Sequence, residues 1–266
     1  MNKKIGFIGC GNMGKSMVLG LLNDEKIIKE NMLISTRTEK SGIKITNETG
    51  IKYTLNNIDV AKFSDILFLA VKPNMYEAVI KEIRDYIKED VIIVTIAAGI
   101  KLSDVEDWFG KDVKIVKTMP NTPAMVGEGM SAICPNSLIE KNELEYICNL
   151  YNNFGKYEIL EEKDFHAFTA LCGSSPAYVF MFIEAMADAA VKLGIPRAKA
   201  YVMAEQSILG SAKLALETGK HPAELKDMVC SPGGTTIEAV IELENQGFRN
   251  SIISAMEKCA YKSKNM

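Results

Sequence analysis

A glycine-rich turn near the start of the chain constrains the fold more than any other feature. Residues 5–8 form a short apolar run typical of a buried strand, and residues 15–22 carry apolar side chains at helical spacing. Between them Gly9, Gly11 and Gly14 give G-x-G-x-x-G. In this setting the first glycine permits a tight turn, the second lets the backbone approach a pyrophosphate, and the third allows close helix–strand packing. The pattern predicts a dinucleotide site at a helix N-terminus, where free N–H groups favour an anion; a purely structural glycine turn is the alternative.

The end of the second predicted strand indicates which dinucleotide binds. Residues 32–35 predict that strand, and an NAD-binding fold usually places Asp or Glu at its end. Ser35, Thr36 and Arg37 stand there instead, and a guanidinium suits the 2′-phosphate of NADP. In the alternative interpretation, Thr36 or Thr38 caps the next helix, and both roles can hold together. We therefore expect NADPH as cofactor, with NADH possible.

Alternating strands and helices continue to about residue 160. Further strands are predicted at residues 65–71, 91–96, 113–118, 129–134 and 157–160, with a helix at 141–154. Ligands bind at the carboxyl ends of parallel strands, so Lys72, Gly99 and Asn121 are expected on that rim. A solvated surface lysine is the alternative for Lys72.

Only helical patterns follow residue 163. The predicted helices are residues 165–172, 175–193, 196–218, 222–229, 235–246 and 248–261. The fold class is therefore an α/β dinucleotide-binding domain, residues 1–162, followed by an all-α domain, residues 163–266. The helix over residues 177–190 is apolar around most of its circumference, which is typical of a central helix or of one covered by a second subunit.

A second stretch with chemical potential precedes a predicted helix. Ser231, Gly233, Gly234, Thr235 and Thr236 combine three hydroxyls with two unshielded backbone segments. At a helix N-terminus such a set forms a pocket for a small carboxylate. A well-capped helix start is the alternative, although capping needs one hydroxyl rather than three.

Composition excludes several classes of protein. The 266 residues carry a formal charge of −3, with no basic face for nucleic acid. No apolar run reaches membrane length, and the N-terminus is unlike a signal peptide. None of the six cysteines is in C-x-x-C spacing, so no metal site is predicted, and free thiols in a cytoplasmic enzyme are expected. The two histidines are expected to be structural.

Five motifs together resemble one enzyme family. They are G-C-G-N-M-G at residues 9–14, A-V-K-P at 70–73, M-P-N-T-P at 119–123, G-S-S-P-A-Y at 173–178, and H-P-A-E-L-K-D-M-V-C-S-P-G-G-T-T-I at 221–237. This combination resembles pyrroline-5-carboxylate reductase, and the last motif is long and specific. The resemblance implies reduction of 1-pyrroline-5-carboxylate to L-proline with NADPH or NADH, by a homodimer that can assemble further into a decamer.

The resemblance also assigns roles to residues. It places the cofactor on Gly9, Gly11, Asn12, Met13, Gly14, Ser35, Thr36, Arg37, Asn57, Ala70, Val71, Lys72, Pro73, Ala97, Ala98 and Gly99. It places the substrate on Ser231, Gly233, Gly234, Thr235 and Thr236, with Thr236 nearest the ring nitrogen as the catalytic residue. Ser175 departs from the glycine usual in the family, which can alter the local backbone or the fit of the substrate.

Two other functions share parts of this pattern. A β-hydroxyacid dehydrogenase has the same domain plan, but that family uses a lysine on the interdomain helix, and here no lysine occurs on that helix before Lys192. A non-catalytic NADP-binding regulator would keep the Gly9–Gly14 loop but would not need the hydroxyls of residues 231–236.

Overall fold

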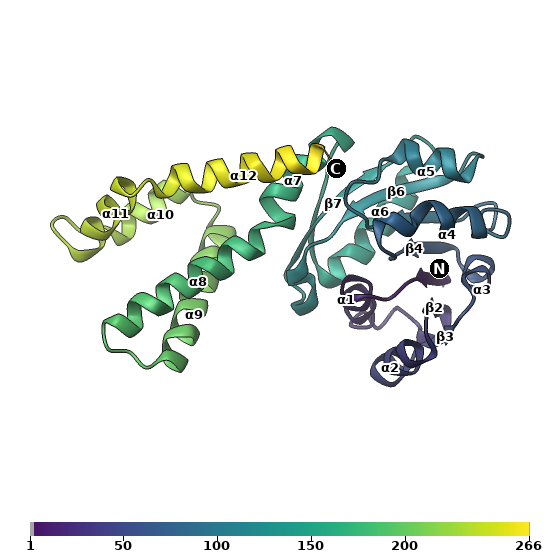
Figure 1. The fold of residues 1–266 in the computed structure, drawn as a ribbon, viewed down its shortest axis with the longest axis horizontal. Coiled ribbons are helices and arrows are strands. Elements are labelled where there is room, and N and C mark those ends of the chain that lie inside the picture. The colour runs from purple at the N-terminus through teal and green to yellow at the C-terminus, as the bar shows by residue number, and fades with distance from the viewer. Residues whose placement is uncertain (1–2, 266) are drawn as a thin grey trace. The chain divides into compact units, whose positions relative to one another are not determined.

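The protein forms two compact units, each described by itself (Figure 1). The structure, a computed structural model, describes residues 3–265. The first unit comprises the described part of Met1–Gly173 and of Cys259–Met266; the second is Ser174–Lys258. Residues 163–173 and the end of the last helix thus group with the α/β unit by their contacts, and the boundary after residue 162 stays a prediction. Helical periodicity shows that a segment is a helix, but not which unit it packs against.

An eight-stranded sheet forms the centre of the first unit, with strand order β3-β2-β1-β4-β5-β6-β7-β8. All adjacent pairs are parallel except β6 with β7. The strands are β1 (Ile5–Ile8), β2 (Met32–Ser35), β3 (Lys52–Thr54), β4 (Ile66–Leu69), β5 (Ile92–Thr95), β6 (Lys114–Met119), β7 (Gly129–Pro135) and β8 (Gly155–Ile159). Every strand predicted from the sequence is present; β3 was not predicted.

Helices cover both faces of this sheet, as a doubly wound α/β fold requires. They are α1 (Asn12–Leu21), α2 (Glu39–Thr49), α3 (Asn57–Phe63), α4 (Tyr76–Ile83), α5 (Leu102–Phe109), α6 (Lys141–Tyr151) and the short α7 (Phe165–Phe168). One apolar core joins the sheet to α1, α2 and α6, and a second joins the opposite face to α3, α4 and α5. The sheet therefore lies between two cores, and its strand ends are left to bind ligands.

The second unit is entirely helical. Its helices are α8 (Ser175–Lys192), α9 (Arg197–Thr218), α10 (Pro222–Val229), α11 (Thr235–Asn245) and α12 (Phe248–Lys264), of which α12 ends in the first unit. This confirms the predicted α/β and all-α classes.

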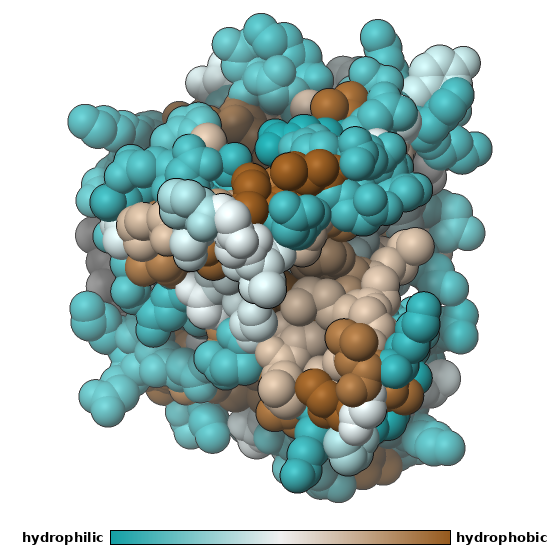
Figure 2. Space-filling model, turned by 90° about the vertical axis from the view of Figure 1, so that its left-hand side faces the viewer, coloured by the Kyte–Doolittle hydropathy of each residue, from teal (hydrophilic) through white to brown (hydrophobic). Residues whose placement is uncertain are grey.

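Much apolar surface of the helical unit stays exposed in the single chain. Exposed apolar side chains on α8 and α9 include Phe180 (64%), Met181 (69%) and Val202 (64%). Figure 2 shows brown, hydrophobic atoms gathered in a band between teal, hydrophilic surfaces. An exposed apolar area of this kind marks an interaction surface.

One helical stretch, Glu162–Lys192, is long and apolar enough to cross a membrane by length and composition alone. Its most apolar window has a mean hydropathy of 1.3 and is 11% buried. The sequence pattern predicted no run of this length, because its longest apolar candidate, residues 177–183, stops at Glu184. A π-helical turn, Thr169–Gly173, precedes α8 in this stretch. The same exposed side chains suit a contact with another subunit.

Candidate functional site

The sheet changes its winding direction between β1 and β4, and the glycine-rich turn lies there. Gly9 has a φ of +86°, and a Cβ at this position would meet the Ala70 carbonyl oxygen at 2.8 Å. A Cβ on Gly14 would add a contact with the Ala70 Cβ at 3.1 Å. The first and third glycines are therefore required by the turn and by close packing of α1 on β4. The crevice above such a switch point is where open α/β sheets bind ligands.

The N-terminus of α1 lies at this switch point. Gly11 is the exposed N-cap residue, and no side chain caps the helix. A Cβ on Gly11 would meet nothing within 4 Å, so a ligand can approach the backbone there. The N–H groups of Asn12 and Met13 precede the first helical hydrogen bond, which Lys15 donates to Gly11. These groups fit the pyrophosphate of a dinucleotide.

Cys10 lies inside the same turn but is not a nucleophile. Burial raises the pKa of its thiol to about 12. Because the thiolate is the reactive form, this cysteine stays inert at neutral pH. All six cysteines are free of disulfides, as predicted.

Ser35 at the end of β2 is held by residues from the next crossover. Its hydroxyl donates to the Asn57 side-chain oxygen at 2.7 Å, and the Asn57 amide donates to Glu82 at 2.9 Å. The structure thus brings together two residues of the expected cofactor set that are 22 positions apart.

Arg37 follows on the exposed surface, and among residues 3–265 no carboxylate pairs with it. Thr38 caps α2 by accepting a hydrogen bond from the Ser41 N–H at 3.3 Å, and the Thr36 hydroxyl donates to the Thr38 carbonyl. Capping therefore belongs to Thr38, and the guanidinium of Arg37 is left available for an anion.

The ends of β4 and β5 are tied together by a buried tyrosine that the sequence analysis did not single out. The Tyr76 hydroxyl donates to the Leu69 carbonyl and accepts from the Ile96 N–H at 3.1 Å. Burial raises its pKa above the ordinary value, so the hydroxyl stays protonated. The segments that follow, Ala70–Pro73 and Ala97–Gly99, are both in the expected cofactor set, with Lys72, Ala98 and Gly99 exposed.

Asn121 follows the carboxyl end of β6, as expected, but its amide is used in hydrogen bonds within the protein. Its nitrogen donates to the Cys172 carbonyl at 2.9 Å, and its oxygen accepts from the Met130 N–H at 2.8 Å. Both ends of this nearly buried side chain are used to join β7 to the turn before α8. Asn121 therefore has a structural role.

The second expected site lies in the helical unit. Gly233 has a φ of +67°, and Gly234 is the N-cap residue of α11, which receives no side-chain cap. The Gly234 N–H bonds the Ser231 carbonyl at 3.0 Å. Within the part of the chain that is described, the hydroxyls of Ser231, Thr235 and Thr236 have no hydrogen-bond partner. This geometry disfavours the alternative of a merely capped helix and fits a carboxylate pocket.

The histidines make structural contacts, as predicted. The His221 ring accepts from the Ala223 N–H at 3.2 Å and so caps α10, and the His166 ring bonds Ser263 at 3.0 Å. Among the described residues, no three His, Cys, Asp or Glu side chains cluster as metal ligands.

Two family models match the chain. One, "NADP oxidoreductase coenzyme F420-dependent", covers residues 4–99, and the other, "Pyrroline-5-carboxylate reductase dimerisation", covers residues 162–266. The pyrroline-5-carboxylate reductase of Escherichia coli (strain K12) is 47% identical over 266 residues, with 100% of this chain and 99% of the relative covered. The chain belongs to the pyrroline-5-carboxylate reductase family. The reductase carries out the final step of proline biosynthesis and binds NADP(H).

Solved structures agree with this assignment. The pyrroline-5-carboxylate reductase from Coxiella burnetii matches with a TM-score of 0.94 at 31% identity, over 100% of this chain and 98% of the other. The Plasmodium falciparum enzyme, solved with NADP bound, matches with a TM-score of 0.89 at 33% identity, over 99% of this chain and 98% of the other. A 3-hydroxyisobutyrate dehydrogenase from Mycobacterium tuberculosis shares only the fold with the reductase, at 11% identity and a TM-score of 0.52. The β-hydroxyacid dehydrogenase alternative therefore has no support beyond the fold.

Proposed function

We propose that the reductase binds NADPH across the switch point, with the adenosine half on β2 and the nicotinamide half on β4 and β5. The uncapped N-terminus of α1, where a Cβ on Gly11 would meet nothing within 4 Å, supports the pyrophosphate position. Arg37, exposed and without an ion-pair partner among residues 3–265, supports a contact with the 2′-phosphate and hence a preference for NADPH over NADH.

The substrate carboxylate is proposed to lie at the N-terminus of α11. The open backbone at Gly233, the helix start at Gly234 without a side-chain cap, and the unpartnered hydroxyl of Ser231 support this position. An α-carboxylate there gains from the free N–H groups and the positive end of the helix dipole.

The hydroxyl of Thr236 is proposed to form a hydrogen bond with the ring nitrogen. Bound NADPH supplies the hydride for the carbon of the C=N bond. Because a protonated imine is already electrophilic, the protein needs to orient the ring and to stabilise the nitrogen as it gains its electron pair. A half-buried hydroxyl beside the carboxylate pocket suits that role. Ser175, where the family usually has glycine, begins α8 and is proposed to leave the reaction unchanged.

The dimerisation domain indicates a homodimer. We propose that the exposed apolar faces of α8 and α9, including Phe180 and Met181, form the subunit contact. Assembly of dimers into a decamer, and a cytoplasmic location, are proposed by family resemblance.

The direct test follows NADPH absorbance with 1-pyrroline-5-carboxylate, and separately with a β-hydroxyacid and NADP⁺. The proposal expects rapid oxidation of NADPH by the imine and no reduction of NADP⁺ by the hydroxyacid. Turnover of the hydroxyacid alone would refute the assignment, and binding of NADPH without either reaction would indicate a regulator.

A further inference from the structure

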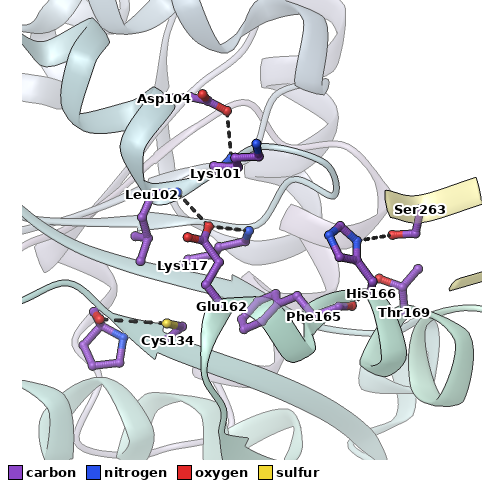
Figure 3. Close-up of polar contacts among 11 residues, drawn as sticks. Lys101, Leu102, Asp104, Lys117, Cys134, Glu162, Phe165, His166, Thr169 and Ser263 are labelled. Carbon is purple, nitrogen blue, oxygen red and sulfur yellow. Dashed lines mark hydrogen bonds and ion pairs between the residues drawn. The ribbon is translucent and has the colours of Figure 1, made fainter. Parts of the chain in front are cut away.

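One carboxylate joins three segments that are distant in the sequence (Figure 3). Glu162 Oε1 accepts a hydrogen bond from the Leu102 N–H at 2.8 Å and another from Lys117 Nζ at 2.8 Å. Leu102 begins α5, Lys117 lies on β6, and Glu162 precedes α7. A single oxygen thus ties the start of α5 to residues 15 and 60 positions further along the chain.

Burial of Lys117 makes its ion pair with Glu162 necessary. The Lys117 side chain is only 7% exposed, and its ammonium lies over the Phe165 ring, 4.9 Å from the centroid. A buried ammonium needs a paired anion, and the ring face supplies only part of that stabilisation. Glu162 is 33% exposed but is fixed between this cation and the positive end of a helix.

The turn held by Glu162 belongs to the expected cofactor site. Ala97–Gly99 follow β5, and only Ile100 and Lys101 separate them from Leu102. Gly99 is exposed with a φ of +80°, and a Cβ on it would meet nothing within 4 Å, so the tip of the turn lacks packing, whereas Ala97 at its start is buried. Asp104 fixes the neighbouring Lys101 N–H at 3.0 Å, but this contact lies within the same segment. Tyr76 holds the start of this segment through the Ile96 N–H, and the bond to Glu162 anchors its far end to the rest of the unit.

We infer that Glu162 is a positioning residue for the nicotinamide half of the cofactor. Its carboxylate fixes the position of the Ala97–Gly99 backbone through the Leu102 N–H, and Lys117 holds the carboxylate in place. This inference rests on the proposed cofactor site, in which β4 and β5 serve the nicotinamide half. It predicts that loss of the carboxylate weakens binding of that half and not of the adenosine half.

The test compares two ligands on the full-length enzyme. NADPH occupies both halves of the site, whereas 2′,5′-ADP lacks the nicotinamide half. Dissociation constants for both are measured by calorimetry on wild type, Glu162→Ala, Glu162→Gln and Lys117→Met, with a melting curve for each. Glu161→Gln is the matched control, because Glu161 forms an exposed pair with Lys163, two positions further along the chain.

Glu162→Ala should raise the Kd for NADPH about five-fold or more and leave that for 2′,5′-ADP within two-fold. Glu162→Gln, which keeps an acceptor for the Leu102 N–H, should have a smaller effect, and Lys117→Met, which keeps the carboxylate, the smallest. Glu161→Gln should match wild type. If Glu162→Ala does not fold, the Kd values for NADPH of the other two variants test the inference, and Glu162→Gln should show the larger rise.

Lower melting temperatures with unchanged Kd values for NADPH would show a purely structural ion pair and overturn the inference. Equal weakening of both ligands would also overturn it. Failure of the wild type to bind NADPH would instead refute the proposed function, so the two failures are distinguishable.

Discussion

Replacing Thr236 separates a catalytic hydroxyl from a helix cap. Thr236 is the second residue of α11, half-buried, and its hydroxyl has no partner among the described residues. Capping would contribute about 1 kcal/mol of stability, but the structure shows no such hydrogen bond. Alanine also has the higher helix propensity, by up to about 0.7 kcal/mol. Thr236→Ala should therefore keep or slightly raise the melting temperature.

The kinetic effect should be large by contrast. One oriented hydrogen bond to a charged or developing-charge centre is worth roughly 1.5–3 kcal/mol, so kcat/KM for the imine should fall about ten- to a hundred-fold. Thr236→Val, which keeps the shape and removes the hydroxyl, should behave like Ala. Thr236→Ser should retain much of the activity. The Kd for NADPH should stay nearly constant in all three.

The assay is steady-state oxidation of NADPH with varied 1-pyrroline-5-carboxylate, with a melting curve on each protein. An Ala variant with wild-type kinetics and a lower melting temperature would show that Thr236 caps the helix and takes no part in catalysis. A Val variant with full activity would refute the hydrogen bond to the ring nitrogen even if Ala is impaired.

Three further perturbations test other parts of the account. Arg37→Ala should raise KM for NADPH about ten-fold or more, with little change for NADH, because a charge-assisted contact with the 2′-phosphate is lost; equal effects on both cofactors would exclude that contact. Phe180→Glu places a charge on an exposed apolar face, so light scattering should find smaller assemblies with an unchanged circular dichroism spectrum, whereas an intact oligomer would exclude this face from the interface. Cys10 should resist alkylation by iodoacetamide at pH 8 in the native enzyme, since burial raises the pKa of its thiol to about 12 and the thiol is protonated below that value; rapid modification there would contradict the buried environment.

Local pattern determined much of this protein. The sequence alone predicted the Gly9–Gly14 turn, the buried strands and the helix starts at Pro222 and Thr235. This was possible because glycine conformation, apolar periodicity and helix-start residues act within a few positions of the chain. The family motifs were equally local. Among the elements that were not predicted, β3 and α3 are short and only partly buried, so their apolar pattern is too brief to identify.

Tertiary structure decided what each side chain does. Asn121 stands on a strand end typical of ligand binding, yet its amide is consumed by Cys172 and Met130. Tyr76 joins two strand ends, and Glu162 joins residues 45 and 60 positions away. Such hydrogen bonds depend on where the chain returns in space, and no periodicity along the sequence encodes that return. The sequence thus determined which backbone elements exist, and the packing of distant segments determined which polar groups remain free to meet a ligand.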